Sequence, residues 1–280
     1  MIFPRMTALA EVLWGTANAK DYSNYFNRLT QHFKEWETKK INFSKAVFEI
    51  TAEVMPNPGG GNGVLYVLKS NQNQANIHYT VDGSQPTAQS LTFSNALTIK
   101  QSQTVKAAYF EETTQKSALS EQAFTIHKAT SCLVNLQNQP DKRYSAGGSF
   151  ALVNGVKGDT QKFGRDWIGF WEKDMVALID LGKKQTITHL NVGTLESPSS
   201  WIYFPNEIVF EVSTDGIKFE TIQTFSQSDI QQAKGNVDWK GKKVKAQFVK
   251  VTAKNKGKIQ DGKPGAGNGP WLFVDEIIVE

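Results

Sequence analysis

The chain has 280 residues and a mass of 31.2 kDa, a length that predicts two or three domains. Its 39% hydrophobic residues, with 17 Phe, 7 Tyr and 7 Trp, exclude a disordered chain. No apolar run approaches the ~18 residues of a membrane span, and the single cysteine, Cys132, excludes an internal disulfide and a multi-cysteine zinc site. The net charge is only +4 and the basic residues are scattered along the sequence, so we expect no nucleic-acid partner.

The first 45 residues have the periodicity of two helices. Pro4 suits a first helical turn, and Gly15 is placed to end the helix that it opens. Asp21 is a good N-cap for a second helix, whose wide apolar stripe comprises Tyr22, Tyr25, Phe26, Leu29, Phe33 and Trp36. Two helices cannot bury such faces against each other alone. We therefore expect them to pack on the domains that follow or on a missing body upstream.

The N-terminus lacks a basic region followed by an apolar core and a cleavage site, so we expect no signal peptide. On this basis the chain is either cytosolic or a fragment of a longer protein.

From about residue 46 the pattern changes to short, alternating segments typical of strands. The predicted strands begin at 47–54 and continue at 64–68, 77–81, 105–110 and 123–126. Residues 55–63 have the composition of a loop, and Asp82-Gly83 marks a tight turn. This spacing predicts a small β-sandwich over residues 46–128, with no chemical constellation of its own, which we interpret as a spacer.

A second β-domain is predicted over residues 129–280. Its expected strands cover 175–180, 187–192, 208–212, 248–253 and 273–279, and Asp215-Gly216 signals a hairpin. Strands without helices at this length predict a jelly roll or similar sandwich. Three long loops, at 154–171, 193–205 and 256–271, are expected to be functional because loops of this length in compact domains usually are.

Aromatic residues gather in these loops. The rings are Trp167, Phe170, Trp171, Trp201, Tyr203, Phe204 and Trp271. Such rings stack on the apolar face of a sugar, whose hydroxyls polar neighbours then satisfy, and the polar candidates are Arg165, Asp166, Lys173, Glu196 and Asn206. The alternative is that most of these rings are buried and form part of the hydrophobic core at the ends of the sandwich.

Residues 154–160 offer side-chain and carbonyl oxygens on a turning backbone, which suits a hard cation such as Ca²⁺. The same composition is also that of an ordinary turn.

No catalytic constellation stands out. Asp275-Glu276 is the only tandem Asp-Glu, and in a strand the two side chains would point to opposite faces. We interpret one of them as a turn or ion contact and neither as an acid catalyst. The four histidines, His32, His78, His127 and His189, match no nucleophile motif and are expected to be surface or structural residues.

Several segments resemble known families. Residues 3–14, FPRMTALAEVLW, resemble the last barrel helix of family-20 glycoside hydrolases, the β-N-acetylhexosaminidases. Residues 78–87, HYTVDGSQPT, are similar to the small sandwich that follows the barrel in chitobiase-like enzymes. The last domain resembles a coagulation factor V/VIII type C (discoidin) module, related to the family-32 carbohydrate-binding modules, through residues 152–155, 167–170, 179–182 and 210–216.

This resemblance implies a mainly β chain in three parts. Residues 1–45 would be terminal helices of a truncated TIM barrel, 46–128 an Ig-like sandwich and 129–280 a discoidin-like module. The catalytic Asp-Glu of the family follows a His-x-Gly-Gly stretch that this sequence lacks, so we expect no catalysis by this chain.

The resemblance also implies ligands and partners. Arg165, Trp167, Trp171, Trp201, Tyr203 and Trp271 are the expected contacts for glycans that contain N-acetylhexosamine or galactose. Discoidin-like modules often carry a structural Ca²⁺, for which the matching candidates are Asn154, Asp159, Thr160 and Glu276; here an Asn stands where an Asp is common. The parent catalytic barrel is the implied protein partner, and its family implies a periplasmic or extracellular location. The leading hypothesis is glycan binding that targets a hydrolase, and the alternative is a structural buttress without a ligand.

Overall fold

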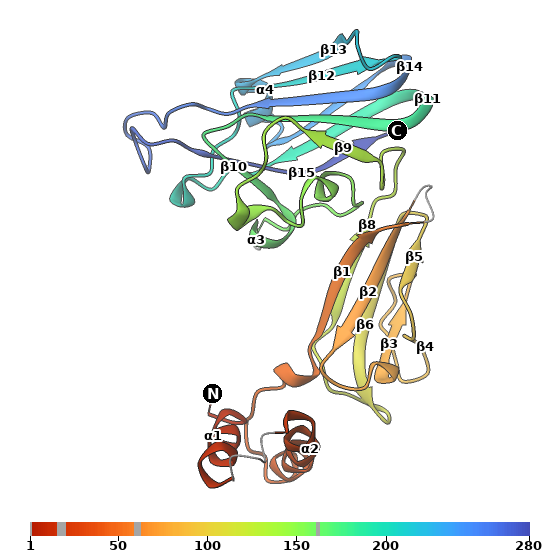
Figure 1. Ribbon diagram of the computed structural model, residues 1–280, viewed down its shortest axis with the longest axis vertical. Coiled ribbons are helices and arrows are strands. Elements are labelled where there is room, and N and C mark those ends of the chain that lie inside the picture. The colour runs from red at the N-terminus through yellow and green to blue at the C-terminus, as the bar shows by residue number, and fades with distance from the viewer. Residues whose placement is uncertain (1, 16–20, 59–62, 161–162) are drawn as a thin grey trace.

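The computed structural model describes residues 2–15, 21–58, 63–160 and 163–280. Figure 1 shows three parts in a row: a helical part at one end, a small β-sandwich in the middle and a larger one at the other end. The chain is thus mainly β with a short helical N-terminal part, as predicted. None of the helices in the described part of the chain combines the length and apolarity needed to cross a membrane.

The helical part consists of α1 (Arg5–Trp14) and α2 (Tyr22–Thr38). The N-cap prediction for α2 is confirmed, because the amide of Asn24 donates to Asp21 Oδ1 at 3.3 Å. The two helices differ in how they pack. The apolar stripe of α2 is buried against Phe43, Phe48 and the small sandwich through Phe26, Leu29, Phe33 and Trp36. The apolar side chains of α1 are exposed, namely Met6, Leu9, Val12, Leu13 and Trp14.

The small sandwich has two antiparallel sheets. One contains β1 (Ile50–Pro56), β2 (Val64–Ser70) and β5 (Leu97–Ile99). The other contains β3 (Ile77–Thr80), β4 (Leu91–Thr92), β6 (Gln103–Glu111), β7 (Thr114–Gln115) and β8 (Ser120–Phe124). Alternate residues of β2 are fully buried, as a strand with one face on the core requires. The predicted loop at 55–63 begins later than expected, since β1 runs to Pro56; its residues 59–62 lie outside the described residues.

The larger sandwich is built from seven strands in the order β10-β15-β11-β14-β12-β13, with β9 paired to β11. These are β9 (Leu133–Leu136), β10 (Ile168–Trp171), β11 (Met175–Thr194), β12 (Glu207–Ser213), β13 (Glu220–Ser226), β14 (Asn236–Lys254) and β15 (Trp271–Val279). The predicted hairpin at Asp215-Gly216 joins β12 to β13. Every residue of β15 is buried, and the strand lies between β10 and β11 in the sheet.

Three expectations for the larger sandwich were wrong. The two strands predicted at 175–180 and 187–192 are one strand, β11, because a β-bulge absorbs the residues between them. The predicted loop at 154–171 contains α3 (Phe163–Asp166) and β10. The domain is also not free of helices, since Ser226 and Asp229 form a capping box that starts α4 (Gln227–Gln232).

The two sandwiches are in direct contact. Ser131 Oγ donates to the carbonyl of Gly63 at 2.6 Å, and the amide of Thr125 donates to the carbonyl of Gly155 at 2.8 Å. Val156, from the larger sandwich, is buried in the core of the smaller one. The segment between β8 and β9 therefore packs on both sandwiches.

Candidate functional site

An aromatic cluster lies where β10, β15 and the segment before β12 meet. Its buried members are Trp167, Leu195, Ile202, Trp271 and Phe273, with Tyr144 and Trp171 partly buried beside them. Trp271 and Trp171 are opposite each other in the β10–β15 ladder, which places their rings 4.9 Å apart in an edge-to-face arrangement. This end of the sandwich is thus covered by rings from three segments that are distant in sequence.

Trp201 is the exposed ring of this region. It follows a 3-10 helix (Pro198–Ser200) and has a left-handed backbone with φ of 58°, uncommon for a residue other than glycine. Its carbonyl accepts from the amide of Trp271 at 2.8 Å, which ties this turn to the start of β15. The indole is 37% exposed and lies stacked at 6.4 Å from the ring of Trp171, with 30° between the planes. The two rings together offer an aromatic surface to solvent.

The segment before β15 holds Trp201 in place. A Cβ atom on Gly265 would lie 2.7 Å from Trp201 Nε1, so only glycine allows this close approach. Tyr203 donates its hydroxyl to the carbonyl of Pro264 at 2.8 Å, and burial raises the pKa of this phenol. Lys256 lies 5.8 Å over the Tyr203 ring. Gly265 thus gives Trp201 a defined position, and Tyr203 ties the same segment down through Pro264.

Arg143 adds a charged group at the same end. Its guanidinium lies 4.9 Å from the centroid of the Trp271 ring, a cation–π geometry. The same guanidinium donates to Asp141 from Nε at 2.9 Å and from Nη2 at 3.1 Å. These bonds lower the pKa of the Asp141 carboxyl to about 2, so the pair stays charged and fixed in position at ordinary pH. Sequence reasoning missed Arg143 and Tyr144, and only their place next to an aromatic residue of β15 reveals them.

The six predicted sugar-contact residues occupy different environments. Trp201 is exposed and Trp171 half-buried, whereas Trp167, Tyr203 and Trp271 are buried. Trp167 donates from Nε1 to the carbonyl of Asp159 at 3.1 Å. Arg165 is exposed on α3, paired with Asp166 at 2.7 Å, and its charge acts on Tyr66 of the small sandwich. The structure therefore brings together Trp201, Trp171 and Trp271, and leaves Arg165 apart from them.

A second site lies at Asp275 and Glu276. In the ladder between β11 and β15, Val192 pairs with Ile277 and Thr194 with Val274, so Gly193 alone faces both acidic residues. This is a β-bulge, which interrupts the alternation of side chains that the sequence analysis assumed. Both carboxyl groups are buried as a result. A Cβ atom on Gly193 would lie 2.3 Å from Asp275 Oδ1, so the bulge requires glycine opposite it.

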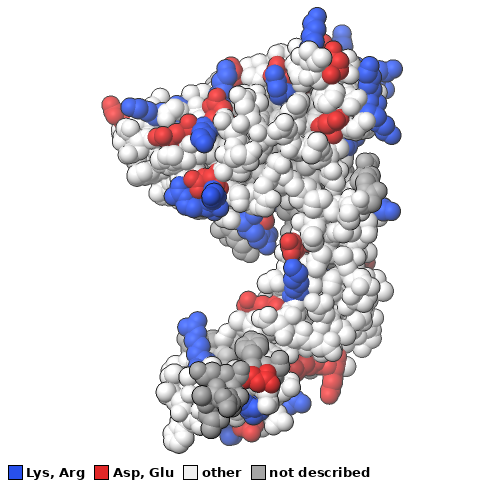
Figure 2. All heavy atoms as spheres, viewed as in Figure 1, with Lys and Arg blue, Asp and Glu red and all other residues white. Residues whose placement is uncertain are grey.

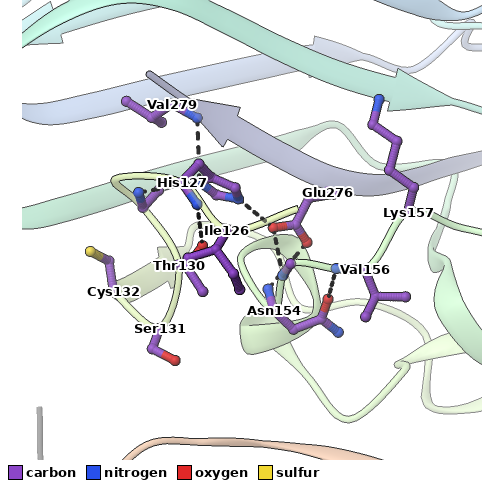
Figure 3. A network of polar contacts seen from close by, with 12 residues as sticks. Ile126, His127, Thr130, Ser131, Cys132, Asn154, Val156, Lys157, Glu276 and Val279 are labelled. Carbon is purple, nitrogen blue, oxygen red and sulfur yellow. Dashed lines mark hydrogen bonds and ion pairs between the residues drawn. The ribbon is translucent and has the colours of Figure 1, made fainter. Parts of the chain in front are cut away.

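Glu276 is surrounded by N–H donors (Figure 3). His127 Nε2 lies 2.6 Å from its Oε1, which also accepts from the amide of Gly155 at 2.8 Å, and its Oε2 accepts from the amide of Asn154 at 3.1 Å. The other ring nitrogen, His127 Nδ1, accepts from the amides of Ala129 at 3.2 Å and Val279 at 3.4 Å. Nδ1 therefore carries no proton, and Nε2 is the donor to the carboxylate. Burial is the largest influence on Glu276 and raises its pKa.

These contacts bear on the four residues expected to hold calcium. Calcium needs six to eight oxygens with free lone pairs, but both Glu276 oxygens face N–H groups, and Asn154 Oδ1 accepts from the amide of Val156 at 2.8 Å. Thr160 is exposed, and the carbonyl of Asp159 accepts from Trp167. Within the described residues, no cluster of three or more His, Cys, Asp or Glu side chains is arranged for a metal. As arranged here, the oxygen atoms at Glu276 and Asn154 are taken up by N–H groups and do not fit calcium.

Comparison with known families separates the chain into two matched segments. Residues 58–121 match the family model "Chitobiase/beta-hexosaminidase C-terminal domain", and residues 137–268 match the "F5/8 type C domain". A search of curated proteins found no match.

Several solved structures are similar to about half of this chain. A chitosan-binding module of a chitosanase/glucanase from Paenibacillus sp. IK-5 is 15% identical and covers 55% of this chain and 98% of its own, with a TM-score of 0.38. A fucose-binding module from Streptococcus pneumoniae is 15% identical over 55% of this chain and 96% of its own, with a TM-score of 0.36. The C-terminal domain of a Bacteroides fragilis chitobiase is 17% identical over 52% of this chain and 92% of its own, with a TM-score of 0.34. The chain thus combines a segment that matches the chitobiase/beta-hexosaminidase C-terminal domain with one that matches the F5/8 type C domain.

Proposed function

We propose that the chain is a non-catalytic accessory region that binds glycans through Trp201 and Trp171. The observation that carries this proposal is an exposed indole held in a left-handed turn and stacked on a second indole. Its position is set by Gly265 and by the backbone of β15, so little freedom is lost when a sugar ring stacks on it. The match of residues 137–268 to the F5/8 type C domain supports it.

The proposed role is to hold a glycoside hydrolase near its substrate. Binding at one shallow aromatic surface would be weak, yet linkage to an enzyme raises the effective concentration of substrate. The parent enzyme is proposed to be a β-N-acetylhexosaminidase in the periplasm or outside the cell. The match of residues 58–121 to the chitobiase/beta-hexosaminidase C-terminal domain supports this assignment.

Tryptophan fluorescence of the full chain, titrated with N-acetylhexosamines, galactosides and their oligomers, tests the proposal. We expect a saturable shift that weakens at least about tenfold in affinity with Trp201→Ala. Trp14→Ala is the matched control, because Trp14 is 88% exposed on α1, outside the aromatic cluster. Unchanged binding by Trp201→Ala would refute Trp201 as the contact.

The second candidate function is a structural buttress without a ligand. The burial of Trp167, Tyr203 and Trp271 favours it, since these rings fill the end of the sandwich. If folded protein shows no change in tryptophan fluorescence with any of the sugars tested, the result supports this second function.

Calcium binding remains a separate proposal that rests on family resemblance. Thermal melting of the full chain with added Ca²⁺ and with a chelator tests it. A melting temperature that does not change between the two would count against the ion, in line with the N–H donors around Glu276.

A further inference from the structure

Two Gly-Lys-Lys repeats lie on neighbouring strands of the larger sandwich. Gly182-Lys183-Lys184 belongs to β11, and Gly241-Lys242-Lys243 belongs to β14. The two strands pair antiparallel along most of their length. The fold thus places side by side two basic segments that are far apart in sequence, which corrects the expectation that the basic residues are scattered.

Each repeat coincides with a break in the ladder. Between the pairs Asp180–Phe248 and Gln185–Ala246, β11 advances by five residues while β14 advances by two. Between the pairs Ile187–Val244 and His189–Lys240, β14 advances by four residues while β11 advances by two. The extra residues leave the plane of the sheet, and in both strands they are the Gly-Lys-Lys residues.

The two bulges form one surface, which we call the lysine ridge: Lys183, Lys184, Lys240, Lys242, Lys243 and Lys245. Only three paired positions separate the bulges, so they lie roughly 13 Å apart along the ladder. All six side chains are exposed. Figure 2 shows Lys and Arg side chains crowded at the end of the larger sandwich where Figure 1 labels β11 and β14.

The charges on the ridge are not neutralised locally. None of the six lysines makes an ion pair with any residue that the structure describes. The nearby carboxylates Asp238 and Glu280 are both bound by His189, at 2.6 and 2.9 Å. The net charge of the whole chain is +4, so without the six lysines of the ridge it would be −2. The ridge therefore carries more positive charge than the net charge of the whole chain.

We infer that the lysine ridge binds an anionic polysaccharide, that is, a glycan carrying carboxylate or sulfate groups. The choice of a glycan rests on the proposed function, whereas the choice of an anion rests on the ridge itself. Lysines are mobile point charges, which suit a flexible polymer with repeated anionic groups. The ridge has no arginine, and the half-buried ring of Trp239, the neighbour of Lys240, packs against the core and over Gly241, so the ridge lacks the freely exposed stacking platform typical of nucleic-acid sites.

Binding of polygalacturonate and heparin by the full chain, measured over a series of salt concentrations, tests the inference. The ridge variant is Lys183→Gln, Lys184→Gln, Lys242→Gln and Lys243→Gln. We expect it to lose at least tenfold in affinity at low salt and to show a shallower dependence on salt. The matched control is Lys34→Gln, Lys39→Gln, Lys40→Gln and Lys100→Gln, which removes the same charge from exposed positions elsewhere and should stay within about twofold of the original affinity.

Three results would overturn the inference. One is absence of polyanion binding by the unchanged chain at low salt. Another is an equal loss in the control variant, which would mean that only net charge matters. The third is tighter binding of duplex DNA, or of vesicles containing anionic lipid, than of either polysaccharide.

Failure of the inference is separable from failure of the proposed function. The ridge variant should keep the fluorescence response to neutral sugars, and Trp201→Ala should keep the binding of polyanions. A chain that binds neutral sugars but no polyanion refutes the ridge alone. A chain that binds both polysaccharides but no neutral sugar refutes the Trp201 proposal and leaves the ridge supported.

Discussion

At the scale of single residues, Asp275 combines a satisfied and an unsatisfied oxygen. Its Oδ2 accepts from the amide of Gly158 at 3.0 Å, whereas Oδ1 is buried without a hydrogen-bond partner among the described residues. Burial raises the pKa of this carboxyl to about 6, although the Gly158 amide and the charge of Lys157 act in the opposite direction. Between the two pKa values, the native state therefore holds a proton that the unfolded chain, with a pKa of about 3.9, has released.

This difference predicts a pH dependence of stability. Between about pH 4 and pH 6 the native state binds more protons than the unfolded state, so the free energy of unfolding falls as the pH rises. Asp275→Asn removes the titration, and we expect a flatter pH profile and a gain at pH 7 of up to about 3 kcal/mol. Thermal melting across this pH range measures both effects.

Asp82→Asn is the control for this prediction. Asp82 is exposed, and the hydrogen bond from Ser84 lowers the pKa of its carboxyl, so it is already ionised throughout the interval. In the control variant, the free energy of unfolding should fall between about pH 4 and pH 6 as steeply as in the unchanged chain. An Asp275→Asn profile as steep as that of the control would contradict the prediction.

At the scale of elements, α1 and α2 show that similar helical patterns can have different partners. Leu29 of α2 is 3% exposed in a core shared with the small sandwich, whereas Leu9 of α1 is 57% exposed. α1 is tied to α2 mainly by polar contacts, such as Thr7 with Tyr25 at 3.0 Å and Glu11 with Arg28. The stability of α1 therefore owes little to apolar burial.

The same substitution in the two helices tests this difference. Leu29→Ala should lower the free energy of unfolding by about 2–5 kcal/mol, because it leaves a cavity in a packed core. Leu9→Ala should change it by less than about 0.5 kcal/mol. Denaturant unfolding of both variants is the measurement, and a loss for Leu9→Ala as large as that for Leu29→Ala would show that α1 is buried in solution.

Local patterns predicted much of the fold. Short β-prone segments identified β2, β6 and β12, and Asp215-Gly216 identified a hairpin, because these signals depend only on neighbours along the chain. The continuity of β11 was not predictable, since Gly182 looks like a strand breaker unless the partner strand can accommodate a bulge. The start of α4 did carry a readable signal, the capping box of Ser226 and Asp229.

The candidate site was less predictable than the fold. Trp167 and Trp201 are both loop tryptophans in sequence, but a Cβ atom on Gly158 would lie 2.3 Å from the ring of Trp167, so backbone covers that ring. Trp201 also packs on a glycine, Gly265 of a later segment, yet it remains 37% exposed. Which ring stays exposed depends on contacts between segments distant in sequence, and the lysine ridge was hidden for the same reason.

At the scale of the whole molecule, His127 connects the segment between the sandwiches to the last strand. It is 149 residues from Glu276 in sequence, and both side chains are fully buried. His127→Ala would leave the carboxylate of Glu276 buried with two donors, the amides of Asn154 and Gly155, in place of three. We expect a loss of about 2–4 kcal/mol in the free energy of unfolding.

His32→Ala is the control, because His32 is exposed on α2. Denaturant unfolding of the full chain is the measurement for both variants. Equal stability of the two would mean that water or another donor replaces the imidazole at Glu276.

The buried position of His127 also has a consequence for how this sandwich can be transferred between proteins. The natural place to cut is before β9 (Leu133–Leu136), where the strands of the larger sandwich begin. A fusion that starts there would leave behind the imidazole on Glu276 and the bond from Thr125 to Gly155. The portable unit therefore begins no later than Thr125, and recombination that respects strand boundaries alone would yield a weakened module.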